Sequence, residues 1–202
     1  MILSSIAVKP NPFRRFISVL FALAALILAM HPIIASAADI SITKGTGTIT
    51  IPSYNADDTL VITGNALAAD DWNTLKALTI NFKLRMENNQ TEIPDSALYN
   101  CTALTALDLS ALPGLKTIKR ESFLNCANLT AVNLSGRTSL QVIETGAFES
   151  CTSLVRVNLS GCSQLTSIAE DAFYRCTALT TLDLSGCTGL KSIGANAFRD
   201  CD

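Results

Sequence analysis

Apolar and polar positions alternate over short stretches of the chain, and this pattern predicts short strands separated by turns. Residues 107–109 read Leu-Asp-Leu, the pattern of a strand with one buried face. Residues 110–114 contain Ser, Pro and Gly and predict a turn, and residues 115–118 supply a second apolar edge. Residues 121–123 predict a turn of helix, with Phe123 pointing inward.

This unit recurs with a constant 25-residue period. The cysteines in phase are Cys101, Cys126, Cys151, Cys176 and Cys201, and the aromatic residues in phase are Phe123, Phe148, Phe173 and Phe198. Each of the first four cysteines is followed by the pattern L-x-x-[LV]-[DN]-L-S. A unit of this size cannot bury its own apolar face, so successive units are expected to stack and to form a parallel sheet.

The segment upstream of the repeats predicts an N-terminal cap over residues 39–74. Asp39–Tyr54 alternates around two glycines and predicts a β-hairpin, and Thr59–Thr63 predicts a further strand. Leu67–Leu78 predicts a short helix, with Asp70–Asp71 well placed to cap its N-terminus. Such a cap would cover the first repeat with a polar outer face.

Residues 1–38 have the order of a secretory signal peptide. They contain three basic residues and no acidic one, followed by the apolar run Phe16–Met30 and the small-residue stretch Ala35–Ala38. We expect cleavage after Ala37 or Ala38. The alternative is an uncleaved anchor, although the apolar run is short for a bilayer span.

The repeat pattern resembles a known family. L-x-x-L-x-L followed by an Asn-or-Cys site is the leucine-rich repeat signature, and A-F-x-x-C-x-x-L resembles the BspA-like family of surface proteins. The resemblance covers residues 93–202 and extends more loosely to Leu75–Ile80, followed by an irregular loop at Asn81–Glu92. It implies an α/β fold, a right-handed leucine-rich-repeat solenoid with a parallel β-sheet on its concave face. Residues 75–202 would form the repeats, without a C-terminal cap.

The Asn-or-Cys site of that family falls at Leu112, Arg137, Cys162 and Cys187. In the family this side chain bonds turn backbone in the interior, and the resemblance implies the same for the two cysteines. Leucine cannot do so, and arginine would extend outward. We therefore expect the first units to be looser or to turn differently.

The cysteines in phase are interpreted as buried thiols that pack beside the inward phenylalanines. Disulfides and a metal ladder are the alternatives. Equivalent Cα atoms on neighbouring strands would be about 5 Å apart, but their Cβ vectors would run parallel. Zinc needs four ligands in a tetrahedron and not in a row. The total of seven cysteines also leaves at least one unpaired.

Composition and charge exclude several kinds of chemistry. The only histidine, His31, lies in the predicted signal peptide, which disfavours Ser-His and Cys-His catalysis. Removal of that segment changes the formal net charge from −2 to −5, so no field suited to nucleic acid is expected. Asp57–Asp58 and Asp70–Asp71 lack the alternating oxygen ligands of a calcium loop. We expect no cofactor, no metal and no enzymatic activity.

The function favoured by the sequence is an exported binding module, secreted or at the cell surface, that recognises an extracellular protein or glycan. The candidate binding residues on the concave strand face are Asp108, Asn133, Arg156, Asn158 and Asp183. We expect no membrane span after signal cleavage and self-association through an uncapped C-terminal edge. The alternatives are a structural spacer and a fragment of a longer surface protein with no ligand of its own. The serines that follow these strands would then only satisfy turn backbone.

Overall fold

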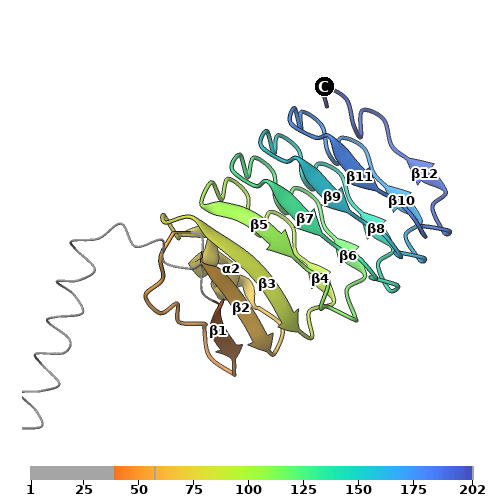
Figure 1. Ribbon diagram of the computed structural model, residues 1–202. Helices are drawn as coiled ribbons and strands as arrows, with labels where there is room; N and C mark the ends of the chain where they lie inside the picture. The colour runs from red at the N-terminus through yellow and green to blue at the C-terminus, as the bar shows by residue number, and fades with distance from the viewer. Residues whose placement is uncertain (1–38, 57, 202) are drawn as a thin grey trace, which may run out of the picture. The chain divides into compact units, whose positions relative to one another are not determined.

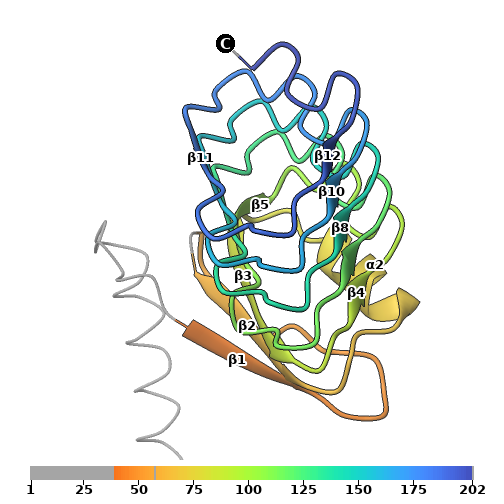
Figure 2. The ribbon, with the colours of Figure 1, turned by 90° about the vertical axis from the view of Figure 1, so that its right-hand side faces the viewer.

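The computed structural model describes residues 39–56 and 58–201. The chain winds into a coil of about five turns, whose strands form two parallel sheets (Figure 1). The long sheet contains β1 (Asp39–Lys44), β2 (Thr59–Gly64), β3 (Phe82–Asn88), β5 (Leu104–Asp108), β7 (Ala131–Asn133), β9 (Arg156–Asn158) and β11 (Thr181–Asp183). The short sheet contains β4 (Glu92–Ile93), β6 (Thr117–Ile118), β8 (Val142–Ile143), β10 (Ser167–Ile168) and β12 (Ser192–Ile193). Figure 2 shows the two sheets on opposite sides of the coil. The predicted signal peptide lies outside the described residues.

The fold confirms the predicted parallel β-solenoid, with less helix than an α/β protein usually has. Within the described residues, the only helix is α2 (Ala69–Lys76). The turn of helix expected at residues 121–123 is a series of hydrogen-bonded turns. The side of the coil opposite the long sheet is therefore formed by strands of two residues each.

The constant period of the repeats sets the register of both sheets. Leu107 pairs with Val132 in the long sheet, and Ile118 pairs with Ile143 in the short sheet. Since these four side chains are buried, each repeat places its apolar residues directly against those of the next. One sequence period thus aligns both apolar edges at once.

A stack of phenylalanine rings runs through the repeats. The ring centroids of Phe123 and Phe148 are 5.0 Å apart, and those of Phe148 and Phe173 are 5.2 Å apart. Phe198 continues the stack at the same spacing of 5.2 Å. The ring planes are nearly parallel, at 5–6°, an arrangement that adds a specific attraction to the burial of each ring.

The predicted hairpin at Asp39–Tyr54 is wrong. β1 pairs in parallel with β2, Asp39 opposite Thr59, and residues 49–54 form no strand. The Ile49 N–H donates instead to the Asp71 carboxylate of α2, at 2.7 Å. The alternation that predicted a second strand reflects a loop held by the helix.

The loop expected at Asn81–Glu92 is also wrong, because it contains the seven-residue strand β3. Leu84 of β3 pairs with Leu107 of β5, an offset shorter than the period of the repeats, and an irregularity between Phe82 and Lys83 adjusts the register. Ile80, the last apolar residue of the looser part of the family resemblance, is 46 % exposed. The division at residue 75 and the absence of a C-terminal cap stay predictions.

Truncation of a central ring tests the contribution of the stack. We expect Phe148→Ala to lower the free energy of unfolding by about 3–5 kcal/mol, because it removes a fully buried ring and both of its stacking contacts. Urea unfolding followed by circular dichroism measures this change. Ile193→Ala is the control, since Ile193 is 51 % exposed. Equal effects of the two substitutions would contradict the role of the stack.

Candidate functional site

The outward face of the long sheet carries two rows of side chains in register. The first row contains Lys83, Ala106, Ala131, Arg156 and Thr181, and the second contains Arg85, Asp108, Asn133, Asn158 and Asp183. All five residues predicted from the sequence therefore lie on one face. Lys83 and Arg85 are not among these five, because the sequence predicts a loop over Asn81–Glu92.

A groove of about 410 Å³ lies on this face. Two small residues, Ala106 and Ala131, contribute to its lining in the first row, between the longer side chains of Lys83 and Arg156. Four of the five predicted residues line the groove. Asp183, on the following strand, does not belong to its lining.

The Asp and Asn side chains of the second row hold the turns at the ends of the strands. Asp108 Oδ1 accepts the Ser110 N–H at 2.9 Å and the Ser110 hydroxyl at 2.6 Å. The same bond to the serine two positions later is made by Asn133 at 3.2 Å, Asn158 at 3.0 Å and Asp183 at 2.8 Å. These side chains thus have a structural role, whether or not they contact a ligand.

The bonds from Ser185 lower the pKa of Asp183, since they stabilise its ionised carboxylate. Asn133 and Asp108 are also linked across neighbouring strands, with Asn133 Nδ2 donating to Asp108 Oδ1 at 3.1 Å. The second row is therefore a polar ladder of side chains that hold turns, with one link across strands, between Asp108 and Asn133. Replacing its members would disturb turns as well as any binding surface.

The basic residues of the groove differ in their partners. Arg85 is neutralised by Asp39 and Glu87, each at 2.8 Å, and the bond to Asp39 is the main cause of its raised pKa. Lys83 and Arg156 make no side-chain hydrogen bond or ion pair with any residue in the described part of the chain. They are the charges of this groove that a ligand can reach without breaking an existing contact. The period-2 alternation of residues 82–86 could have revealed Lys83.

The cysteines are buried or half-buried thiols, which confirms their predicted packing role. Cys126, Cys151 and Cys176 each donate from Sγ to a backbone carbonyl 28 residues earlier, at 3.1–3.3 Å. Cys162 and Cys187 do the same toward Leu134 and Leu159, the role implied for the Asn-or-Cys site. Over residues 39–56 and 58–201, no cluster of three or more His, Cys, Asp or Glu could hold a metal ion.

Of the two units expected to turn differently, the unit with Leu112 does so, whereas the unit with Arg137 turns like the later repeats, so the prediction is wrong for the second unit. Gly136, Gly161 and Gly186 take positive φ angles of 69°, 74° and 76°, whereas the equivalent Ala111 does not. Arg137 is half-buried and donates from Nε to the Ser135 carbonyl at 3.3 Å. The side chain therefore satisfies backbone within its own turn.

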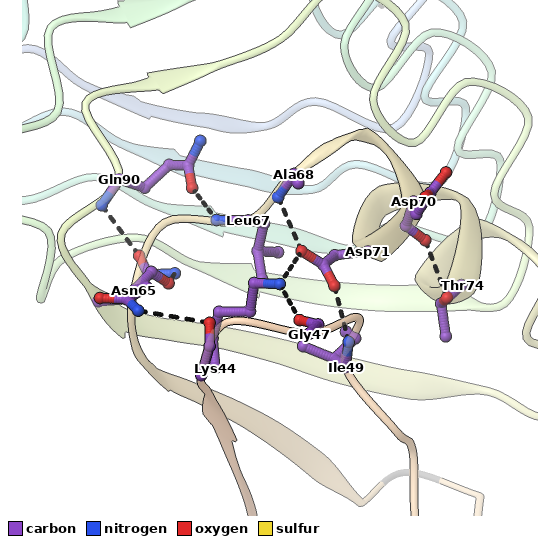
Figure 3. A network of polar contacts seen from close by, with 12 residues as sticks. Lys44, Gly47, Ile49, Asn65, Leu67, Ala68, Asp70, Asp71, Thr74 and Gln90 are labelled. Carbon is purple, nitrogen blue, oxygen red and sulfur yellow. Dashed lines mark hydrogen bonds and ion pairs between the residues drawn. The ribbon is translucent and has the colours of Figure 1, made fainter.

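A buried polar network lies at the N-terminal end of the described coil (Figure 3). The Lys44 ammonium contacts the Asp71 carboxylate at 2.9 Å and donates to the Gly47 carbonyl. Asp71 also accepts the N–H groups of Ile49 and Ala68, both at 2.7 Å. Asp71 thus caps the helix from its first turn, with Ala68 rather than an aspartate at the N-cap position. Because its charges are paired within the protein, this network joins the loop to the helix.

Comparison with protein-family models identifies the family of the repeats. Residues 76–202 match the BspA type leucine rich repeat region in six copies. The chain belongs to the BspA-type leucine-rich repeat family. A comparison with curated proteins gave no match.

A crystal structure of the T. pallidum leucine rich repeat protein is similar to this BspA-type chain at 19 % sequence identity, with a TM-score of 0.36. The alignment covers 81 % of this chain and 60 % of that chain. In the described part of the BspA-type chain, no helix is long and apolar enough to cross a membrane.

The buried ion pair predicts a loss of stability in acid. Burial alone would raise the pKa of Asp71, but its bonds from Ala68, Lys44 and Ile49 prevail and lower it. Ionised Asp71 therefore stabilises the fold above the unfolded pKa of about 3.9, and this stabilisation is lost as the pH falls through the lower folded pKa. Urea unfolding between pH 7 and pH 2 measures the effect.

At pH 7 we expect Asp71→Asn to lower the free energy of unfolding by about 3 kcal/mol, because it leaves Lys44 buried without its counter-charge. The variant should also lose part of the acid dependence. Asp70→Asn, an exposed change in the same helical turn, is the matched control. Identical acid profiles for Asp71→Asn and the parent chain would refute this assignment.

The burial of the cysteine thiols predicts slow alkylation of the folded protein. Burial raises the pKa of Cys176 to about 12 and that of Cys162 to about 11, and it raises those of Cys126 and Cys151 as well. Since the thiolate is the reactive form, we expect these four to react with iodoacetamide at pH 8 only after unfolding. The half-buried Cys187 and Cys201 should react first. Peptide mapping that finds three disulfides would overturn the interpretation.

Proposed function

We propose that this BspA-type repeat protein is an exported binding module that recognises an extracellular protein or glycan through the outward face of its long sheet. The observation that carries the proposal is the groove of about 410 Å³ between two basic side chains, Lys83 and Arg156. A concave site with a few polar groups is the usual form of a binding site. Family membership supports a binding role over a catalytic one, because leucine-rich repeats of this type are typically binding modules.

The predicted residues then take two different roles. Arg156 is the member of the set that is free to contact a ligand, whereas Asp108, Asn133, Asn158 and Asp183 hold turns and define the polar edge of the face. All four lie on the outward face of the long sheet. We include all five in the proposed surface, with Arg156 as its main contact.

Binding through this face is expected to be weak for one site. Interface hot spots favour Trp, Tyr and Arg, and Arg156 is the only free one of these in the groove lining. Many copies on a cell surface would raise the effective affinity without new contacts. The proposed surface localisation would supply such copies, and residues 1–38 would bring it about by directing export.

The second candidate is a structural spacer without a ligand. The polar ladder favours it, since four of the five predicted residues already have partners within the protein. A binding module would lose ligand binding when the groove is obstructed, whereas a spacer has no binding to lose.

Obstruction of the groove distinguishes them. The purified chain is tested for binding to a panel of immobilised extracellular matrix proteins and glycans by biolayer interferometry. We expect Ala131→Trp to reduce binding at least tenfold, because the ring fills the groove at one of its two small residues. Val142→Trp is the matched control on the outward side of the short sheet.

Circular dichroism and the thermal midpoint establish that both variants keep the fold. Binding that survives Ala131→Trp but is lost in Val142→Trp would place recognition on the opposite side of the coil. If no member of the panel binds the parent chain, the spacer is favoured instead.

A further inference from the structure

We propose that the groove binds an extended acidic peptide segment with two carboxylates four residues apart, one held by Lys83 and the other by Arg156. This inference rests on the proposed function, since it assigns a ligand chemistry to the same face. It depends on the spacing of the two free cations, on the small residues between them and on the charges around them.

The strand register fixes the separation of the Cα atoms of these two basic residues. Lys83 pairs with Ala106, Ala106 with Ala131, and Ala131 with Arg156, so three strand spacings lie between their Cα atoms. At about 4.8 Å per strand, this distance is about 14 Å. Both side chains point outward from the same row, and they lie near the two ends of the groove lining.

An extended peptide reproduces that separation. Its residues rise about 3.3 Å each, so positions i and i+4 are about 13 Å apart. Because side chains alternate between the two sides of an extended chain, these two positions also point the same way. Two acidic residues at i and i+4 can therefore reach Lys83 and Arg156 together, with the peptide lying across the strands.

The lining between the cations accommodates the middle of such a peptide. Ala106 and Ala131 leave room above the sheet, where longer side chains would fill the groove. Near Arg156, the Asn158 Oδ1 is occupied by the Ser160 N–H at 3.0 Å, while its Nδ2 has no partner in the described part of the chain. Arg156 and Asn158 together thus offer several donors to one carboxylate.

The surrounding charges favour a peptide over a sulfated glycan. Asp108 lies in the second row between the two cations, and Arg85 is already neutralised by Asp39 and Glu87. The chain as a whole is acidic, with a formal net charge of −2 that becomes −5 without residues 1–38. A continuous polyanion would meet this repulsion along its length, whereas a ligand with two separated carboxylates and a neutral middle avoids it.

The test uses the full chain and short labelled peptides with blocked ends, measured by fluorescence anisotropy. The probe is Glu-Ser-Ala-Ser-Glu. The controls are Glu-Ser-Ala-Ser-Ala-Glu, whose acids point to opposite sides when extended, and Gln-Ser-Ala-Ser-Gln, which has no charge. We expect the probe to bind at least tenfold more tightly than either control, and less tightly as salt is raised.

The double variant Lys83→Gln/Arg156→Gln removes both contacts and should weaken probe binding at least tenfold. Lys116→Gln/Arg120→Gln removes the same charge from exposed positions outside the groove and should leave binding unchanged. Ala131→Trp should also abolish probe binding, because it obstructs the groove without removing either cation.

Several results would overturn the peptide assignment. These are equal affinity for the probe and both control peptides, undiminished probe binding in Lys83→Gln/Arg156→Gln, and binding of a sulfated oligosaccharide at least as tight as that of the probe. The proposed function is judged separately. If a matrix ligand is lost in Ala131→Trp but retained in Lys83→Gln/Arg156→Gln, the face binds a ligand of other chemistry, and the peptide assignment is wrong. If that ligand is retained in both variants, both proposals are wrong.

Discussion

The structure depends on one constraint, which is that no single repeat can bury its own apolar residues. Each unit supplies one strand to each sheet, one inward phenylalanine and one inward cysteine, and each of these needs a neighbour to complete its contacts. The stacked rings, 5.0–5.2 Å apart, and the thiol bonds to a carbonyl 28 residues earlier are consequences of this arrangement. Stability is thus distributed along the coil through contacts between adjacent repeats.

The N-terminal end satisfies the same constraint by other means. β1 and β2 extend the long sheet without the pattern of the repeats, and α2 packs Trp72 and Leu75 into the core. Loop residues 45–49 are held by the bonds of Lys44 and Ile49 to Asp71 and not by strand pairing. A buried pair of this kind contributes little net stability when intact but is costly to break, so it fixes the position of the loop more than it strengthens the fold.

The sequence predicted the repeats well because the same apolar, phenylalanine and cysteine positions recur every 25 residues. Leu107 and Val132 support each other's assignment through a constant period, and so do the phenylalanines and cysteines. The hairpin and the loop at Asn81–Glu92 were wrong where that support is absent. Ile49 and Ile51 alternate like a strand, yet the pairing of β1 is decided by β2, which is distant in sequence. Leu84 of β3 pairs with Leu107 of β5, an offset shorter than the period of the repeats, so a search at the constant period does not find β3. Lys83, which lies on β3, was therefore not predicted.

The candidate site was predictable in place but not in chemistry, because a period-2 pattern says which side chains point outward and not which of them are already bonded. The second row is constrained, since Asp108, Asn133 and Asn158 each hold a turn through a serine two positions later. Substitution there disturbs the fold as well as the surface. The side chains of the first row, from Lys83 to Arg156, hold no turn, and they lie on the same sheet. The first row can therefore be changed, by exchanging alanines for larger side chains or by moving a cation to another strand, while the second row keeps the turns in place.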